Sequence, residues 1–222
     1  MSGRGVCYVV WGDDSRRGYA WHVQAAARAA GYARRQGLAT ALLAEAEPPA
    51  GLFDRFVPAP EGWAGAGGFY RKWLGLTLTP FEHTLLTDTD LLVTGDVSLA
   101  WAAVERFGLA ATYAPGQVLQ WAGREYPHFQ GGFLGFAGRR PDLLAAIDAA
   151  RLELGAAEYD DEAALSLALW REERPPFVLP SVFNVVVSGY VHPRPIRGWH
   201  SPLPPQSHLV SVLDNPNDRV EV

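Results

Sequence analysis

Residues 83–90 read HTLLTDTD, an apolar run that ends in two aspartates separated by one residue. Short runs of this kind are typical of buried strands in a parallel sheet. In extended backbone, side chains two residues apart lie on the same side, so Asp88 and Asp90 can converge. Carboxylate oxygens are good ligands for Mg²⁺ or Mn²⁺, and these cations also bind phosphate oxygens. The stretch predicts a cation site at the end of a strand, with an aspartate-rich turn as the alternative interpretation.

Segments with the patterns of strands and helices alternate on both sides of this stretch. The predicted strands cover residues 6–11, 38–44, 53–57, 83–87, 109–113, 133–136, 177–179, 184–188 and 196–199. The predicted helices cover residues 19–36, 69–78, 99–107, 141–154 and 160–170. Residues 58–68 and 115–127, which contain proline and glycine, are predicted to be irregular. The alternation predicts an α/β fold with a mostly parallel mixed sheet flanked by helices, whose ligands bind at the carboxyl ends of the strands.

The bulk properties exclude several classes of protein. The chain has 222 residues, so residues 1–222 are predicted to form one domain, with residues 215–222 as a fraying tail. A net charge of -5 gives no basic surface for nucleic acid. No stretch approaches the roughly 18 apolar residues that span a bilayer, and the N-terminus lacks the features of a signal peptide. The single cysteine, Cys7, is interpreted as a core residue, and the lack of a disulfide predicts a cytoplasmic protein.

The region around residues 83–90 resembles the glycogenin-like and galactinol-synthase-like nucleotide-sugar transferases of the GT-A fold. That group has a basic residue, a helix, a Pro-Phe step, an apolar strand, an Asp-x-Asp motif and a further Asp before a helix. In this chain the corresponding residues are Lys72, Pro80, Phe81, Asp88, Thr89, Asp90 and Asp96.

Three later segments follow in the order of the same group. Residues 128–136 (HFQGGFLGF) resemble its Phe-Asn-Ser/Ala-Gly-Val strand, with Gln130 where asparagine is usual. Residues 160–165 (DDEAAL) resemble its Asp-Gln-x-x-Leu helix start, with Glu162 in place of glutamine. Residues 179–184 (LPSVFN) resemble its Leu-Pro-x-x-Trp/Phe-Asn step.

The resemblance implies a metal-dependent glycosyltransferase that uses a nucleotide-diphosphate sugar, with a UDP-sugar as the expected donor and an unidentified acceptor. Mn²⁺ or Mg²⁺ is the implied cofactor, with Asp88, Asp90 and a C-terminal histidine as its ligands. His200 fits the histidine's position better than His192. Asp161 and Lys72 are the implied catalytic residues. The implied donor-binding residues are Trp11, Asp14, Lys72, Asp88, Thr89, Gly131 and Gly132.

Two further observations concern single side chains. Lys72 is the only lysine among 19 basic residues, which makes it a candidate for a specific role, with a chance occurrence as the alternative. Trp63, Trp121 and Tyr126 lie in segments predicted to be irregular, where they either stack on an acceptor sugar or simply pack.

Two other functions fit parts of the pattern. Phosphatases of the haloacid-dehalogenase type also have an Asp-x-Asp motif after an apolar strand, but there the strand is the first in the chain. Here several predicted strands and helices precede residues 83–87, which disfavours a phosphatase. A non-catalytic protein that binds nucleotide sugars is the second alternative, and an assay of donor hydrolysis distinguishes it from an enzyme.

Overall fold

The computed structural model describes residues 3–12, 18–60, 68–155, 161–173, 175–180, 183–186 and 198–200. For residues 68–69, 115–116, 185–186 and 198–200, only the backbone is described. Of the predicted site residues, Asp14, Trp63 and His192 lie outside these ranges, as does the tail at residues 215–222.

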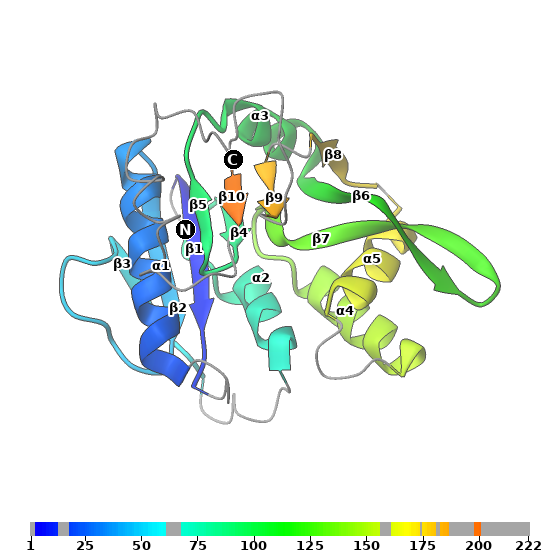
Figure 1. The fold of residues 1–222 in the computed structure, drawn as a ribbon, viewed down its shortest axis with the longest axis horizontal. Coiled ribbons are helices and arrows are strands. Elements are labelled where there is room, and N and C mark those ends of the chain that lie inside the picture. Colours follow the sequence, from blue (N-terminus) through cyan, green and yellow to red (C-terminus); the bar gives the residue numbers. More distant parts are fainter. Residues whose placement is uncertain are drawn as a thin grey trace.

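Seven strands form one sheet in the order β3-β2-β1-β4-β7-β6-β8, which Figure 1 shows across the centre of the molecule. These strands are β1 (Arg4–Val10), β2 (Ala39–Ala44), β3 (Arg55–Pro58), β4 (His83–Thr87), β6 (Leu109–Trp121), β7 (Arg124–Ala137) and β8 (Phe177–Leu179). β1, β2, β3 and β4 run parallel, and β8 runs parallel to β6. β7 is antiparallel to both of its neighbours, β4 and β6. The predicted α/β fold with a mostly parallel mixed sheet is therefore confirmed.

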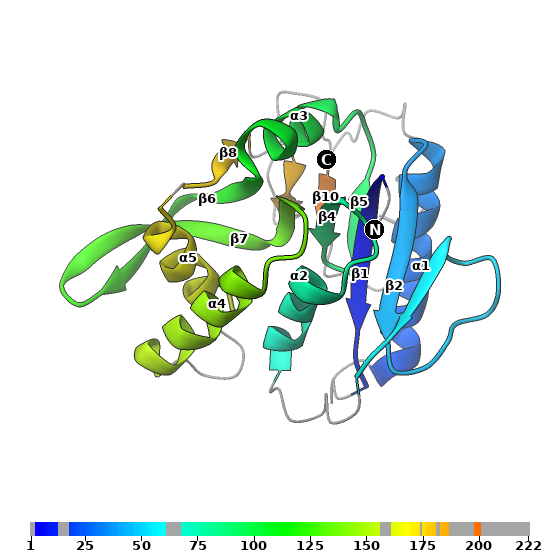
Figure 2. The ribbon, with the colours of Figure 1, turned by 180° about the vertical axis from the view of Figure 1, so that it is seen from behind.

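Helices cover both faces of this sheet, as the opposite views in Figures 1 and 2 show. They are α1 (Gly18–Arg35), the 3-10 helix η2 (Gly68–Leu74), α2 (Gly75–Leu78), α3 (Ser98–Phe107), α4 (Pro141–Leu154) and α5 (Asp161–Arg171). Successive side chains of β1 point to opposite faces, so Tyr8 packs with α1 and α3 while Cys7 packs with η2, α2, α4 and α5. Burial raises the pKa of Cys7 to about 12, as expected for a core residue. The helix predicted at residues 69–78 is divided between η2 and the single turn α2.

A second sheet brings the end of the described chain beside the Asp-x-Asp motif. Its order is β5-β10-β9, with β5 (Leu91–Val93), β10 (Gly198–His200) and β9 (Val185–Val186). β10 is antiparallel to β5, and His200 pairs with Leu91. Leu91 directly follows Asp90, so the backbone of His200 lies next to the end of the motif.

The prediction that residues 115–127 are irregular is wrong. β6 and β7 form a long hairpin that extends to the right of the sheet in Figure 1. Pro115 and Pro127 led to the prediction, because proline is rare inside paired strands. The register shifts between Tyr113 and Val118, so an irregularity in β6 accommodates Pro115 while the pairing resumes beyond it.

The turn of this hairpin contains a side chain in an unfavourable backbone conformation. Trp121 pairs with Arg124 across a two-residue loop, in which Ala122 has φ 50° and Gly123 has φ 71°. Positive φ at both positions favours glycine or asparagine. We expect Ala122→Gly to raise the free energy of unfolding by about 0.5–1 kcal/mol, measured by urea denaturation. Gly123→Ala is the matched control and should lower it, and two variants of equal stability would contradict this account.

Candidate active site

Lys72 joins two carboxylates that come from different elements of the fold. Its Nζ lies 2.7 Å from Asp161 Oδ2 at the start of α5 and 3.3 Å from Asp88 Oδ1 at the carboxyl end of β4. The side chains of Lys72 and Asp161 are 11% and 7% exposed, whereas that of Asp88 is 24% exposed. The structure thus brings together three of the predicted site residues at the edge of the sheet where α/β proteins bind ligands.

The neighbouring charges keep Lys72 protonated. Burial alone would lower the pKa of its ammonium group, but Asp161 and Asp88 raise that pKa above the usual range. Burial raises the pKa of Asp161, and the Lys72 ammonium counteracts this. Burial also raises the pKa of Glu162, the next residue, while a hydrogen bond from the Gly131 amide counteracts it. The Lys72 ammonium is thus paired with two carboxylates, Asp161 and Asp88, and Glu162 adds a third acidic group near it.

The backbone of β7 approaches Lys72 closely at Gly131. A Cβ atom added to Gly131 would lie 2.5 Å from Lys72 Nζ and 3.3 Å from Asp161 Oδ2. The neighbouring Gly132 carbonyl accepts a hydrogen bond from the Asp88 amide at 3.1 Å. The backbone of Gly131 therefore lies beside the Lys72 ammonium, and that of Gly132 is hydrogen-bonded to Asp88. Both glycines are predicted donor-binding residues.

The Asp-x-Asp motif forms a turn, so the prediction of extended backbone at Asp88 and Asp90 is wrong. β4 ends at Thr87, and the Leu91 amide donates to the Asp88 carbonyl at 3.2 Å. β4 does not continue into β5, because β5 belongs to the second sheet, where it pairs with β10. Among the side chains that the structure describes, no group of three His, Cys, Asp or Glu residues is arranged to hold a metal ion. The side chain of the predicted ligand His200 lies outside this described set.

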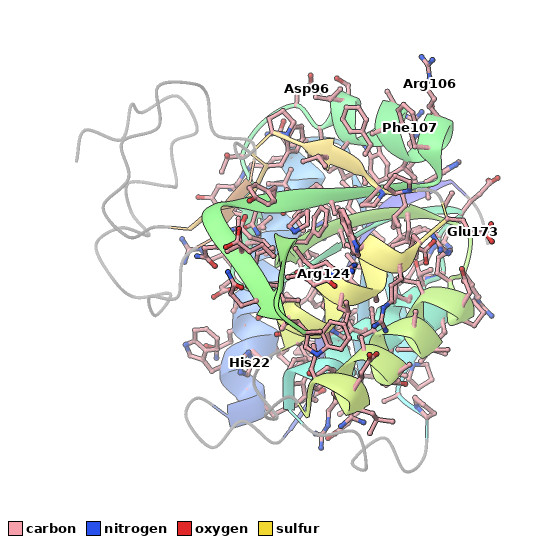
Figure 3. The ribbon with its side chains drawn as sticks, turned by 90° about the vertical axis from the view of Figure 1, so that its right-hand side faces the viewer. His22, Asp96, Arg106, Phe107, Arg124 and Glu173 are labelled. Carbon is pink, nitrogen blue, oxygen red and sulfur yellow. The ribbon has the colours of Figure 1, made fainter. Side chains whose placement is uncertain are left out.

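His22 contacts the same motif, although no sequence pattern predicted this placement. Its Nδ1 lies 3.4 Å from Thr89 Oγ1, and Figure 3 shows it projecting from α1. The His22 ring is stacked with Trp11, at a centroid distance of 6.3 Å, and meets Trp21 edge-on at 4.8 Å. Large aromatic side chains at the start of an alanine-rich helix are the sequence signal that could have indicated this cluster. Trp11, a predicted donor-binding residue, therefore lies in an aromatic group beside the motif.

Trp121 and Tyr126, two other aromatic residues considered from the sequence, lie away from Lys72. Trp121 and Tyr126 contact each other in the β6–β7 hairpin, with ring centroids 6.2 Å apart. Tyr126 also meets Trp170 edge-on, and the Arg171 guanidinium lies over the Trp121 ring. Asp161 begins α5 and Trp170 is near its end, a separation of about 13 Å along the helix. These contacts fit the interpretation that Trp121 and Tyr126 pack against neighbouring side chains.

Solved structures with a similar fold are glycosyltransferases. The chain is similar to the glycosyltransferase GlyE of Streptococcus pneumoniae TIGR4, with a TM-score of 0.56 and 17% identity over 82% of this chain and 46% of GlyE. It is similar to a glycosyltransferase involved in the glycosylation of the major capsid of PBCV-1, with a TM-score of 0.54 and 14% identity over 88% and 92% of the two chains. Mouse xyloside xylosyltransferase 1 gives a TM-score of 0.54 and 8% identity over 90% and 97%.

These similarities confirm the predicted glycosyltransferase fold. The chain spans less than half the length of GlyE and nearly the whole length of the other two proteins. No protein-family model matches the sequence, and no curated protein matches it. In the part of the chain that the structure describes, no helix has both the length and the apolar character needed to cross a membrane.

Proposed function

We propose that this protein is a metal-dependent glycosyltransferase that transfers a sugar from a nucleotide-diphosphate sugar to an acceptor. A UDP-sugar is the expected donor. The observation that carries the proposal is the Lys72 ion-pair network with Asp88 and Asp161, located at the carboxyl end of β4 in a glycosyltransferase fold. The same observation disfavours the phosphatase alternative, because the aspartate motif follows β4 rather than the first strand of the chain.

The acidic residues around Lys72 suit a divalent cation. Asp88 and Asp90 offer hard oxygen ligands, and Mg²⁺ or Mn²⁺ commonly takes one or two carboxylates together with substrate phosphates. His200 would be the third protein ligand, supported by the pairing of its backbone with Leu91. When bound, the cation would neutralise charge that develops on the departing nucleoside diphosphate.

The remaining residues would bind and orient the donor. The Lys72 ammonium would attract the diphosphate, and its buried position would strengthen that electrostatic attraction. Asp161 would accept hydrogen bonds from sugar hydroxyls, held in place by Lys72. Gly131 and Gly132 would allow a sugar to approach the backbone closely. Trp11, Asp14 and Thr89 would contact the nucleoside.

Ligand-induced stabilisation tests this proposal. UDP should stabilise the protein against heat in Mn²⁺ but not in EDTA, because without a cation the diphosphate and the carboxylates repel each other. At 100 times the Kd, the gain in unfolding free energy is about 2.7 kcal/mol. Asp90→Asn should abolish the gain, whereas Asp148→Asn, the same change at an exposed position of α4, should preserve it. Equal stabilisation in EDTA would contradict the metal-dependent mode of binding.

Turnover separates an enzyme from a protein that only binds nucleotide sugars. With Mn²⁺ and a UDP-sugar, we expect the wild-type protein to release UDP slowly by hydrolysis, and Asp90→Asn to release none. Stabilisation by Mn²⁺ and UDP without any release of UDP from several UDP-sugars would instead support the non-catalytic alternative.

A further inference from the structure

β7 changes its pairing with β6 beside Lys72. Ala111 of β6 pairs with Leu134, but the next residue, Thr112, pairs with Gln130. Residues 131–133 of β7 are therefore skipped in the pairing with β6. Bulges of this kind recur next to active sites because they redirect the backbone groups of a strand. A buried N–H within such a bulge needs an acceptor from another element.

The carboxylate of Glu162 supplies the acceptor for the bulged strand. The Gly131 amide donates to Glu162 Oε1 at 2.7 Å, and hydrogen bonds to carboxylates are among the stronger ones in proteins. Glu162 lies in the first turn of α5, which packs against β7, as Figure 1 shows. One turn further along α5, Ser166 Oγ accepts the Phe129 amide at 2.8 Å. Helix α5 therefore holds β7 at two points, the first of which lies in the bulge.

The β7 backbone that Glu162 holds lies beside Lys72 and Asp88. The backbone at Gly131 lies so close to Lys72 that an added Cβ would displace Nζ, and the Gly132 carbonyl accepts a hydrogen bond from the Asp88 amide. Movement of this backbone would therefore change the distances between Lys72 and its two carboxylates.

We propose that Glu162 is a positioning residue, whose carboxylate holds the Gly131 N–H and thereby fixes the backbone that aligns Lys72 with Asp88. Its importance for donor binding rests on the proposed function, whereas the alignment of Lys72 does not. The essential property of Glu162 is the oxygen acceptor at the end of its side chain. Glutamine provides the same acceptor without the charge, while methionine keeps the length of the side chain and removes both oxygens.

The single lysine of the chain makes this proposal directly measurable. In metal-free protein labelled with ¹⁵N in lysine and glycine, Lys72 gives one side-chain signal, and Gly131 gives an assignable amide. Glu162→Met should speed exchange of the Gly131 amide with solvent by about 10-fold or more and shift or broaden the Lys72 signal. Glu162→Gln should keep both as in the wild type. Should Glu162→Met not fold, Glu162→Ala serves as the second variant without an acceptor.

Ser166→Ala is the matched control, because it removes a second hydrogen bond between α5 and β7. It should speed exchange of the Phe129 amide, observed with uniform ¹⁵N labelling, and leave Gly131 and Lys72 unchanged. Wild-type exchange at Gly131 together with a wild-type Lys72 signal in Glu162→Met would overturn the proposal. A Glu162→Gln variant that behaves like Glu162→Met would also overturn it, because charge and not the acceptor would then be essential.

Donor affinity provides the functional measurement. Calorimetric titration with UDP in Mn²⁺ should show affinity about 10–100-fold weaker for Glu162→Met, and close to wild type for Glu162→Gln. If the wild-type protein does not bind UDP in Mn²⁺, the proposed function fails, while the Lys72 and Gly131 signals still decide the positioning role. Unchanged affinity in a Glu162→Met protein whose Lys72 signal has shifted would overturn the link between positioning and donor binding.

Discussion

Replacing Lys72 by methionine should lower the free energy of unfolding by about 3 kcal/mol and abolish donor binding. The variant leaves Asp161, whose side chain is 7% exposed, without the ammonium that lies 2.7 Å away. Removal of one partner from a buried ion pair typically costs about 3–5 kcal/mol. The lower end applies because Asp88, the second partner, is 24% exposed and remains partly solvated. Urea denaturation measures the stability, and calorimetric titration with UDP in Mn²⁺ measures the binding.

Two further variants separate the charge of Lys72 from its shape. In Lys72→Met the buried Asp161 carboxylate has lost the Lys72 ammonium, and adding Asp161→Asn removes that negative charge. The double variant should therefore be more stable than Lys72→Met and still fail to bind the donor. Lys72→Arg keeps the charge but places a larger, planar guanidinium where Nζ lies close to the Gly131 backbone, so donor affinity should fall. A Lys72→Met protein with wild-type stability and wild-type affinity would show that the lysine has no specific role.

The first and last residues of several elements could be predicted, because the residues that determine these ends lie within the element or next to it. The strand at residues 83–87 is an apolar run between polar residues, and it agrees with β4. Helix α4 covers the predicted residues 141–154 because Pro141 suits a helix start and Gly155, with φ 56°, suits a helix end. The uniqueness of Lys72 also indicated a specific contact, and the structure places its ammonium beside Asp88.

Other features depend on contacts between distant segments and carry no such local signal. The turn at Asp88 exists because β5 pairs with β10, more than a hundred residues away in the sequence. Pro115 and Pro127 favour irregular backbone locally, but pairing between β6 and β7 outweighs that preference. The contacts of His22 with Thr89 and of Glu162 with Gly131 likewise follow from how α1 and α5 pack on the sheet. The motifs therefore indicated Lys72, Asp88 and Asp161, which lie together in the structure, but not the contacts that His22 and Glu162 make beside them.

Gly131→Ala should reduce kcat/KM for donor turnover by about 100-fold while costing little stability. The added methyl group would lie 2.5 Å from Lys72 Nζ, which must move. Nζ is the end of a flexible side chain, so the structure can relax at a cost of about 1 kcal/mol. A displacement of about 1 Å in a catalytic group can nevertheless cost about 100-fold in rate. Steady-state kinetics of UDP release and urea denaturation measure the two effects.

Two other glycines serve as controls for this substitution. Gly135→Ala would bring its methyl group within 2.7 Å of Val104 in the core, so it should lower stability without moving Lys72. Gly31 lies within α1 and an added Cβ meets nothing within 4 Å, so Gly31→Ala should raise stability by up to about 1 kcal/mol at unchanged turnover. The Lys72 ¹⁵N signal should shift in the Gly131 variant alone. A Gly131→Ala protein with wild-type turnover and an unshifted lysine signal would show that the position of the ammonium does not limit the reaction.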